Sequence, residues 1–272
     1  MTSKIVSRKN LSEQLYKLEI KASGAFSTFK PGQYVILRTT TSAAITLPIV
    51  KTNTTRETLT VIAPSIPEKL SALLNPCPTH IELELEGPFG EPFRIEKFGS
   101  VLCVANQESI IPLYPVIVAL RAAGNQVTCL LTETSGDQFL ENELRNISEN
   151  FISNTENTPR RASQLMEQSL RRQKYDQVFA IGSAKTIREI CTICTTTSTP
   201  VQAMLYLNEQ NQEGRHGIFR ISICGNTRSL CVDGYNFNAY YASFEELVKR
   251  FGNEEKEASG TRNVSGKTNV PV

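Results

Sequence analysis

From residue 100 onward the chain repeats one rhythm, in which a short apolar run is followed by a longer amphipathic segment. Runs of strand length, bounded by turn residues, alternate with segments whose apolar residues recur at helical spacing. This alternation predicts a parallel sheet with crossover helices, because parallel strands need long connections. The expected strands are 101–105, 126–134, 175–183 and 201–207, and the expected helices are 112–124, 137–151 and 184–194. The polar stretch 152–162 is expected to form a loop.

Residues 4–94 show a different pattern, with several short β-rich runs and no long helix. Turn residues separate these runs at short intervals, which predicts a small antiparallel barrel. One helical insert is expected at 68–75, where Pro67 suits the first turn. The expected strands are 14–22, 32–39, 57–64 and 80–87.

A third region begins at residue 208. It holds a polar loop, a strand pair at 217–224 and 227–234 joined through Gly225 and Asn226, and a closing amphipathic helix at 243–251. The last twenty residues have no apolar face and are expected to be disordered. The predicted divisions are a barrel at 1–98, an α/β domain at 99–207, a C-terminal module at 208–252 and a tail at 253–272.

Composition excludes several classes of protein. Apolar residues make up 40% of the chain and charged residues 21%, which is typical of a globular protein. The formal net charge of +2 gives no basic stripe for nucleic acid. No stretch approaches 18 uninterrupted apolar residues, so no membrane span is expected. Seven cysteines without an apolar leader sequence indicate a reducing, cytoplasmic location.

Several segments spread along the chain carry a resemblance to a known family. They are "KPGQYVILR", "EGPFGEPFRIEKFGSVLCV", "PLYPVIVALRAAGNQV", "YDQVFAIG" and "CVDGYNF" with "SFEELVKRF". Together they resemble the small subunit of sulfide dehydrogenase. The related families are the small subunit of NADH-dependent ferredoxin–NADP oxidoreductase and, more distantly, the electron-transfer subunit of dihydroorotate dehydrogenase. The resemblance covers residues 4–251 in order, and it implies a ferredoxin-reductase-like barrel followed by a nucleotide-binding-type α/β domain.

The resemblance implies three cofactor sites and one partner. Members of these families carry FAD on the barrel, bind a nicotinamide dinucleotide on the second domain and hold a [2Fe–2S] cluster in the C-terminal piece. A large flavoprotein subunit related to glutamate synthase is the implied partner.

The implied flavin motif is altered in this chain. Ala44 stands where an arginine is expected, Thr46 where a proline is expected, and Pro48, which lacks a backbone N–H, where a hydroxyl is expected. In the implied pyrophosphate loop, only Ser65 and Lys69 offer donors. These changes are expected to weaken flavin binding without excluding it. FAD is therefore the one implied cofactor that the sequence does not exclude. The other candidate contacts are Leu47, Gly87, Pro88, Phe89 and Gly90, although the last four also suit a tight turn between domains.

The implied dinucleotide turn has lost its glycines. Ala105, Asn106, Gln107 and Ser109 replace all four, and their side chains fill the volume that phosphate and nicotinamide need. Glu108 adds a negative charge beside the phosphate position. The chain is therefore expected not to bind NAD(P) in the manner of these families.

The implied cluster ligands are also replaced. They fall on Asn211, His216, Phe219 and Cys231. Phe219 cannot ligate iron and Asn211 is a poor substitute for a carboxylate, so the four ligands that a [2Fe–2S] cluster needs are not present. The [2Fe–2S] cluster is expected to be lost, and no metal site is assigned there.

Zinc is an alternative for the cysteines, because Cys191, Cys194, Cys224 and Cys231 have paired spacing. However, Cys191 and Cys194 lie one turn apart within an expected helix, where small buried thiols are the more common interpretation. Cys103 and Cys129 sit in apolar strands and are expected in the core.

These losses, together with a retained scaffold, favour a divergent electron-transfer small-subunit homologue with no catalytic residue of its own. The expected role is structural or regulatory, beside a large flavoprotein subunit related to glutamate synthase. The alternative is a working FAD-containing, NAD(P)H-dependent electron-transfer subunit that lacks the [2Fe–2S] cluster.

Overall fold

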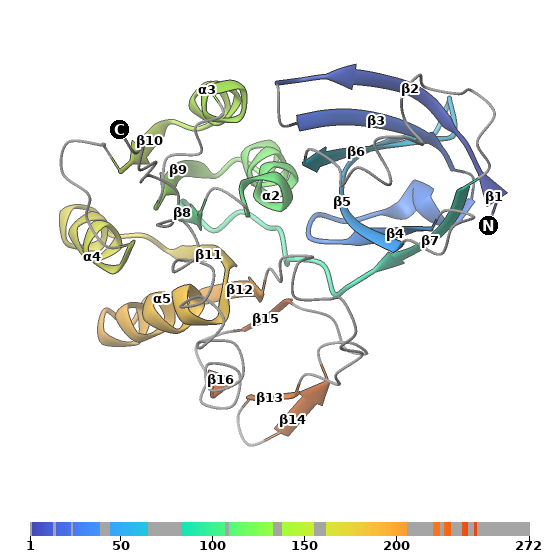
Figure 1. The fold of residues 1–272 in the computed structure, drawn as a ribbon. Coiled ribbons are helices and arrows are strands. Elements are labelled where there is room, and N and C mark those ends of the chain that lie inside the picture. The colour runs from blue at the N-terminus through green and yellow to red at the C-terminus, as the bar shows by residue number, and fades with distance from the viewer. Residues whose placement is uncertain are drawn as a thin grey trace, which may run out of the picture.

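The structure is a computed structural model. It describes residues 2–12, 15–22, 24–38, 44–64, 83–106, 109–132, 138–154 and 162–205, together with short strands at 220–223, 226–229, 236–238 and 242–243. Figure 1 shows an antiparallel sheet built by the first third of the chain beside an α/β unit built by the middle of the chain. The predicted two-part architecture is confirmed. The predicted helix at 68–75 and tail at 253–272 lie outside the described residues.

The antiparallel sheet has seven strands in the order β1-β7-β4-β5-β6-β3-β2. Its apolar side chains alternate with polar ones, and the inward set forms one core that includes Leu18, Val35, Leu47 and Leu85. The strands are β1 (Thr2–Ser3), β2 (Ile5–Asn10), β3 (Leu15–Lys21), β4 (Tyr34–Arg38), β5 (Ala44–Asn53), β6 (Thr58–Pro64) and β7 (Leu83–Phe89), with a 3-10 turn η1 at Gly24–Thr28.

The sheet curls so that consecutive parts of one N-terminal segment form both of its edge strands. β1 pairs with β7 and β2 pairs with β3, yet only Lys4 separates β1 from β2 in the chain. The Lys21 N–H donates to the Lys4 carbonyl at 2.9 Å, which holds the segment at this crossing. The two edge strands are therefore consecutive parts of one extended segment, which gives the barrel-like form of the domain (Figure 1).

The second sheet has the order β10-β9-β8-β11-β12-β15, with parallel pairing except for β15. Helices α2 and α3 pack on one face, and α4 and α5 pack on the other. The strands are β8 (Ser100–Ala105), β9 (Gln126–Leu131), β10 (Asn150–Ser153), β11 (Gln177–Gly182), β12 (Val201–Leu205) and β15 (Asn236–Asn238). The helices are α2 (Ile110–Ala122), α3 (Gln138–Ile147), α4 (Ala162–Arg172) and α5 (Ala184–Thr196). The predicted parallel sheet with crossover helices is confirmed.

Two boundaries in this domain differ from those expected. The helix expected to reach residue 151 ends at Ile147, and β10 occupies Asn150–Ser153, partly inside the expected loop. The cause is tertiary, because Glu149 holds the start of β9: its carboxylate accepts from the Val127 N–H at 2.7 Å and forms an ion pair with Arg121. This arrangement starts a parallel pairing of β10 with β9 in which Phe151 lies opposite Cys129.

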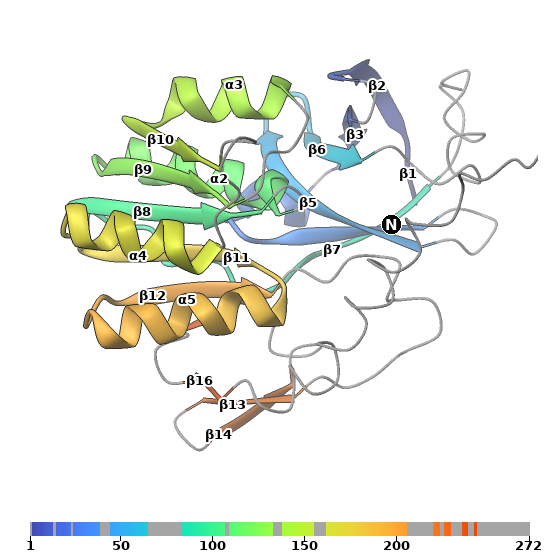
Figure 2. The same cartoon turned by 60° about the vertical axis from the view of Figure 1, so that its left-hand side comes forward.

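Helix α2 connects the two domains. Its sequence is apolar on all sides, and eight of its thirteen residues are buried. A helix of this kind needs cover all round. The parallel sheet supplies one side, and barrel residues Leu15 and Ile62 join α2 in the same core. Figure 2 shows the helix between the sheet and β5. The two domains therefore share a hydrophobic core through α2.

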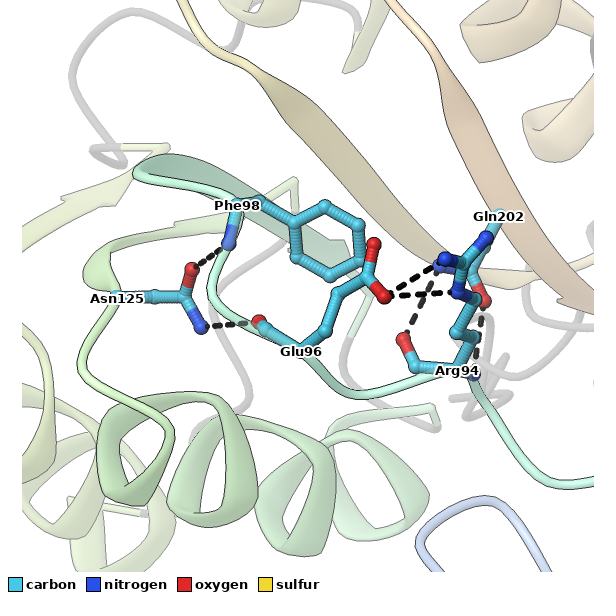
Figure 3. A network of polar contacts seen from close by, with 5 residues as sticks. All are labelled: Arg94, Glu96, Phe98, Asn125 and Gln202. Carbon is cyan, nitrogen blue, oxygen red and sulfur yellow. Dashed lines mark hydrogen bonds and ion pairs between the residues drawn. The ribbon is translucent and has the colours of Figure 1, made fainter.

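The connector from the barrel to the α/β domain, residues 93–99, is held by two side-chain amides (Figure 3). Asn125, which is 3% exposed, accepts from the N–H groups of Phe98 at 2.7 Å and Gly99 at 3.0 Å. It also donates to the carbonyls of Glu96 at 2.8 Å and Leu120 at 2.9 Å. All four hydrogen-bonding positions of this amide are thus used.

A second amide holds the same connector from β12. Gln202 accepts from the Arg94 N–H at 2.9 Å and donates to the Arg94 carbonyl at 3.2 Å (Figure 3). The side chain thus pairs with the connector backbone as a neighbouring strand would. The Asn125 and Gln202 side chains both bind connector residues that are far from them in sequence. Together they fix the path of the connector.

The C-terminal module contains a three-stranded sheet in the order β14-β13-β16. The predicted strand pair is confirmed, because β13 (Arg220–Ile223) and β14 (Asn226–Ser229) form an antiparallel pair. Ser243 ends β16 (Ala242–Ser243) rather than opening the expected helix, whose other residues lie outside the described ones. Within the described residues, no helix combines the length and apolar character that a bilayer crossing needs.

Candidate functional site

The α/β sheet has a topological switch point between β8 and β11. The chain leaves β8 toward β9 on one side, and it leaves β11 toward β12 on the other. In open α/β sheets, ligands bind in the crevice outside the carboxyl ends of the two strands at such a point. Ala105 and Ile181 lie opposite each other there. The turn that follows β8 therefore occupies the position of a dinucleotide site.

The β8–α2 turn is closed by two of its own side chains. The Asn106 N–H donates to the Ser109 hydroxyl oxygen at 3.0 Å, and the Ser109 N–H donates to Asn106 Oδ1 at 3.0 Å. Ser109 is fully buried. These reciprocal bonds resemble a capping box, in which two backbone donors are satisfied by side chains. Both described amides of the turn are thus engaged within the protein.

The same serine bridges the switch point. Its hydroxyl lies 2.7 Å from the Ile181 carbonyl at the end of β11 and 2.6 Å from Asn106 Oδ1, so its single hydrogen is donated to one of these two acceptors. Opposite, the Ala105 carbonyl accepts from the Thr132 N–H at 2.9 Å. The groups that line the crevice are therefore bound to one another.

The other helix that starts at the switch point also supplies its own cap. Ser183 precedes α5, and its hydroxyl accepts from the Thr186 N–H at 3.3 Å. A phosphate at a helix N-terminus binds to N–H groups of this kind. The loss of nicotinamide binding remains a prediction, and two of the residues on which it rests, Gln107 and Glu108, lie outside the described residues.

The outward face of the barrel carries the described part of the predicted flavin site. Leu47 is 1% exposed and belongs to the barrel core, so only its backbone is available to a ligand. Its neighbours Thr46 and Pro48 face outward, and they pair with Ile36 and Tyr34 of β4. Ser65 and Lys69 lie outside the described residues and remain predictions.

Aromatic side chains cover one end of this face. Phe89 is 38% exposed, which is unusual for so large an apolar side chain, and its ring centroid lies 5.9 Å from that of Tyr34. Pro48 lies opposite Tyr34 on β5. The three residues therefore contribute apolar surface to this end of the face.

The Gly87–Gly90 turn positions this aromatic pair. Its Gly87–Pro88 peptide is cis, and both glycines have positive φ, at 129° and 86°. A Cβ on Gly90 would lie 2.9 Å from the Tyr34 ring, and Gln33 donates to the Gly90 carbonyl at 3.1 Å. The packing of Tyr34 thus accounts for Gly90 without a ligand, as the interpretation of this stretch as a tight turn expects.

The predicted cluster positions Asn211, His216, Phe219 and Cys231 lie outside the described residues, as does Cys224 of the zinc alternative. Cys191 and Cys194 lie in α5 and pack in the sheet core, as expected for buried thiols. Burial raises the pKa of Cys191, Cys194 and Cys129 to about 12, and that of Cys103 well above its usual value. In the part of the chain that the structure describes, no group of three metal-ligating side chains gathers.

Comparison with known proteins agrees with this architecture. No family model matches the chain. It is 24% identical over 254 residues to a "Dihydroorotate dehydrogenase B (NAD(+)), electron transfer subunit homolog" from Thermotoga maritima, covering 91% of this chain and 90% of that protein. The structure matches a chain of NADH-dependent reduced ferredoxin–NADP oxidoreductase with a TM-score of 0.72 and 23% identity, covering 97% and 99% of the two chains.

A second solved structure shares the same fold. A ferredoxin–NADP+ reductase from Neisseria gonorrhoeae with bound FAD and NADP matches with a TM-score of 0.56 and 15% identity, over 75% of this chain and 98% of that one. The ferredoxin-reductase-like fold expected from the sequence is therefore confirmed.

Proposed function

We propose that this chain is a subunit of a flavoprotein oxidoreductase, and that this subunit does not itself bind a nicotinamide dinucleotide or take hydride from one. The chain has the ferredoxin–NADP reductase fold. It is similar along nine tenths of its length to an electron-transfer subunit homologue. Its role is structural or regulatory, beside a larger flavoprotein subunit. The resemblance to the sulfide dehydrogenase small subunit suggests that this partner is related to glutamate synthase.

The observation that carries the proposal is the buried Ser109 bridge across the switch point. A dinucleotide needs free backbone donors and open space at this position. Here Asn106 and Ser109 use each other's amides, and the serine hydroxyl lies against the Ile181 carbonyl. A pyrophosphate entering this turn would leave buried polar groups unpaired, at about 1–3 kcal/mol for each group.

Titration with NADH tests this proposal. We expect the wild-type protein to show no saturable NADH binding, with any Kd weaker than about 1 mM. In the matched variant Asn106→Gly/Ser109→Gly, the turn loses the side chains that close it, and its affinity for NADH should rise relative to the wild type. Isothermal titration calorimetry measures the NADH affinity of both proteins. Micromolar binding of NADH by the wild type would show that the contacts of Asn106 and Ser109 do not close this turn to a dinucleotide.

A second candidate function concerns the barrel alone. The outward surface of Tyr34, Pro48 and Phe89 is apolar, partly exposed and formed by rigid strands, which favours a flavin ring at this position. The fit is incomplete, since Pro48 offers no N–H to the ring edge. A flavin bound there would supply electron transfer, with this chain binding and orienting the ring.

An absorption spectrum tests the second candidate. If the barrel carries FAD, the purified protein, alone or with its larger subunit, should show a flavin band at about 450 nm, and Phe89→Ala should reduce the bound fraction several-fold. Val6→Ala is the matched control, because Val6 is also exposed, at 49%, and lies on the edge strand β2. A colourless protein that also takes up no added flavin would exclude this candidate.

A further inference from the structure

One outward face of the antiparallel sheet is formed by the neighbouring strands β5, β6, β3 and β2 (Figure 1). In β3, Leu18 points into the barrel core, so Lys17 and Glu19 on either side of it point outward. In β6, Val61 points inward in the same way, and Thr60 points outward, opposite Glu19. The register of these strands therefore determines which other side chains share the face.

Three lysines share this outward face. Lys9 of β2 lies directly opposite Lys17 of β3, and Lys51 of β5 lies directly opposite Thr60 of β6. Since Thr60 lies opposite Glu19, Lys51 is two strands away from Glu19 on the same face. All three lysines are exposed. We call Lys9, Lys17 and Lys51 the lysine face.

The pairing of Lys9 with Lys17 opposes folding. Like charges directly opposite each other on antiparallel strands are destabilising, and neither lysine forms an ion pair with any of the residues that the structure describes. The nearby Glu19 carboxylate instead accepts from the hydroxyls of Thr58 at 2.9 Å and Ser7 at 3.2 Å. The stability of the sheet therefore does not account for this pair of lysines.

Protection of the sheet edge accounts for one of the three lysines. Charged side chains on an edge strand hinder its pairing with another chain, and Lys9 lies on the edge strand β2. However, Lys17 lies on β3, between β2 and β6, and Lys51 lies on β5, between β4 and β6. Because both of these strands are paired on each side, their lysines need another explanation.

The distribution of charge favours a protein over a continuous polyanion. Glu19 lies between Lys17 and Lys51 on this face, so a regular row of phosphates would meet a carboxylate as well as the lysines. Carboxylates on a protein surface are placed individually, and their positions can match the lysines alone. Val6 of β2, at 49% exposure, adds apolar surface beside the charges, as is usual in protein interfaces.

We propose that the lysine face is a docking surface for a partner protein that presents acidic side chains. Docking here goes beyond both candidate functions, because it requires neither a flavin nor a nicotinamide dinucleotide. The attraction is electrostatic and exposed to solvent, so it weakens as salt is added.

A fluorescein-labelled peptide of alternating glutamate and serine is a suitable probe, because its carboxylates are spaced rather than continuous. At low salt, we expect the wild-type protein to raise the fluorescence anisotropy of this peptide in a saturable manner. The variant Lys9→Gln/Lys17→Gln/Lys51→Gln should bind the peptide about tenfold more weakly, since each exposed ion pair contributes about twofold.

The matched control is Arg171→Gln/Arg172→Gln/Lys174→Gln, which removes the same charge from exposed residues at the end of α4 and just beyond it. It should leave the affinity unchanged within about twofold. An equal loss in both variants, or no binding by the wild type, would overturn the assignment of the lysine face. Tighter binding of an oligothymidylate of the same length, with the same dependence on the lysines, would replace the acidic protein with a nucleic acid.

Folding stability provides a second test that needs no partner. Lys17→Gln relieves the repulsion with Lys9, so the urea midpoint should stay the same or rise. The same measurement shows whether the variants remain folded in the binding assay. A lower midpoint for Lys17→Gln would mean that this lysine stabilises the sheet, and its assignment to docking would then be wrong.

Discussion

Replacing Asn125 with alanine should lower the free energy of unfolding by about 3 kcal/mol, because one side chain satisfies four backbone groups of the connector and of α2. Alanine leaves the Phe98 and Gly99 N–H groups and the Glu96 and Leu120 carbonyls without this partner. The connector is the covalent link between the two domains, and it should become more mobile. Urea denaturation gives the change in stability, and hydrogen exchange of residues 96–99 reports the loss of protection.

Asn125→Asp is the informative control, because it keeps the acceptor and loses the donors. Its carboxylate would face the Glu96 and Leu120 carbonyls, which raises the pKa of the introduced aspartate above its unfolded value of about 3.9. A group with a raised folded pKa contributes stability below its unfolded pKa and loses it as pH rises. The stability of this variant, relative to the wild type, should therefore fall as the pH is raised above about 4. A pH-independent difference would show that the two donated bonds contribute little.

The periodicity of the sequence was sufficient for most of the fold. The short β-rich runs predicted β3, β4, β6 and β7 of the barrel but not β1, β2 or β5, and the strand–helix rhythm predicted β8, α2, β9, β11, α5 and β12. No element was expected at α4, where only four of eleven residues are apolar, namely Ala162, Leu165, Met166 and Leu170. β10 was hidden for a different reason, since its pairing depends on Glu149, Val127 and Arg121, which meet only in the folded domain.

The residue types at the candidate site could be predicted from the sequence, but the contacts between them could not. The sequence showed that the glycines of the resembled families are replaced in the β8–α2 turn. It could not show that Ser109 meets Ile181, which lies 72 positions along the chain.

The Asn125 and Gln202 side chains and the shared core restrict the motion of the two domains relative to each other. In many two-domain proteins the domains move relative to each other, because the interface is small or polar. Here α2 is buried against both domains, and Asn125 and Gln202 fix the path of the connector. The barrel is thus held in a constant orientation relative to the α/β domain.

Gly99→Ala should cost about 3 kcal/mol of folding stability, the second large effect expected at this connector. Gly99 has φ of +120°, which side chains rarely adopt, and an added Cβ would lie 2.5 Å from Asp176 Oδ2. That oxygen accepts from the Ser100 N–H at 2.9 Å, at the start of β8. The methyl group therefore both strains the backbone and displaces a carboxylate that holds the first strand of the parallel sheet.

Gly124→Ala separates these two causes. Gly124 also has positive φ, at +83°, but the nearest atoms to an added Cβ are those of the Lys97 side chain at 4.0 Å. This variant should lose only the backbone term, about 1 kcal/mol. Asp176→Ala removes the hydrogen bond without strain and should also cost about 1 kcal/mol. The urea midpoints of the three variants report these changes in folding stability. Equal losses of stability for Gly99→Ala and Gly124→Ala would mean that the contact with Asp176 relaxes freely and that this carboxylate does not constrain the connector.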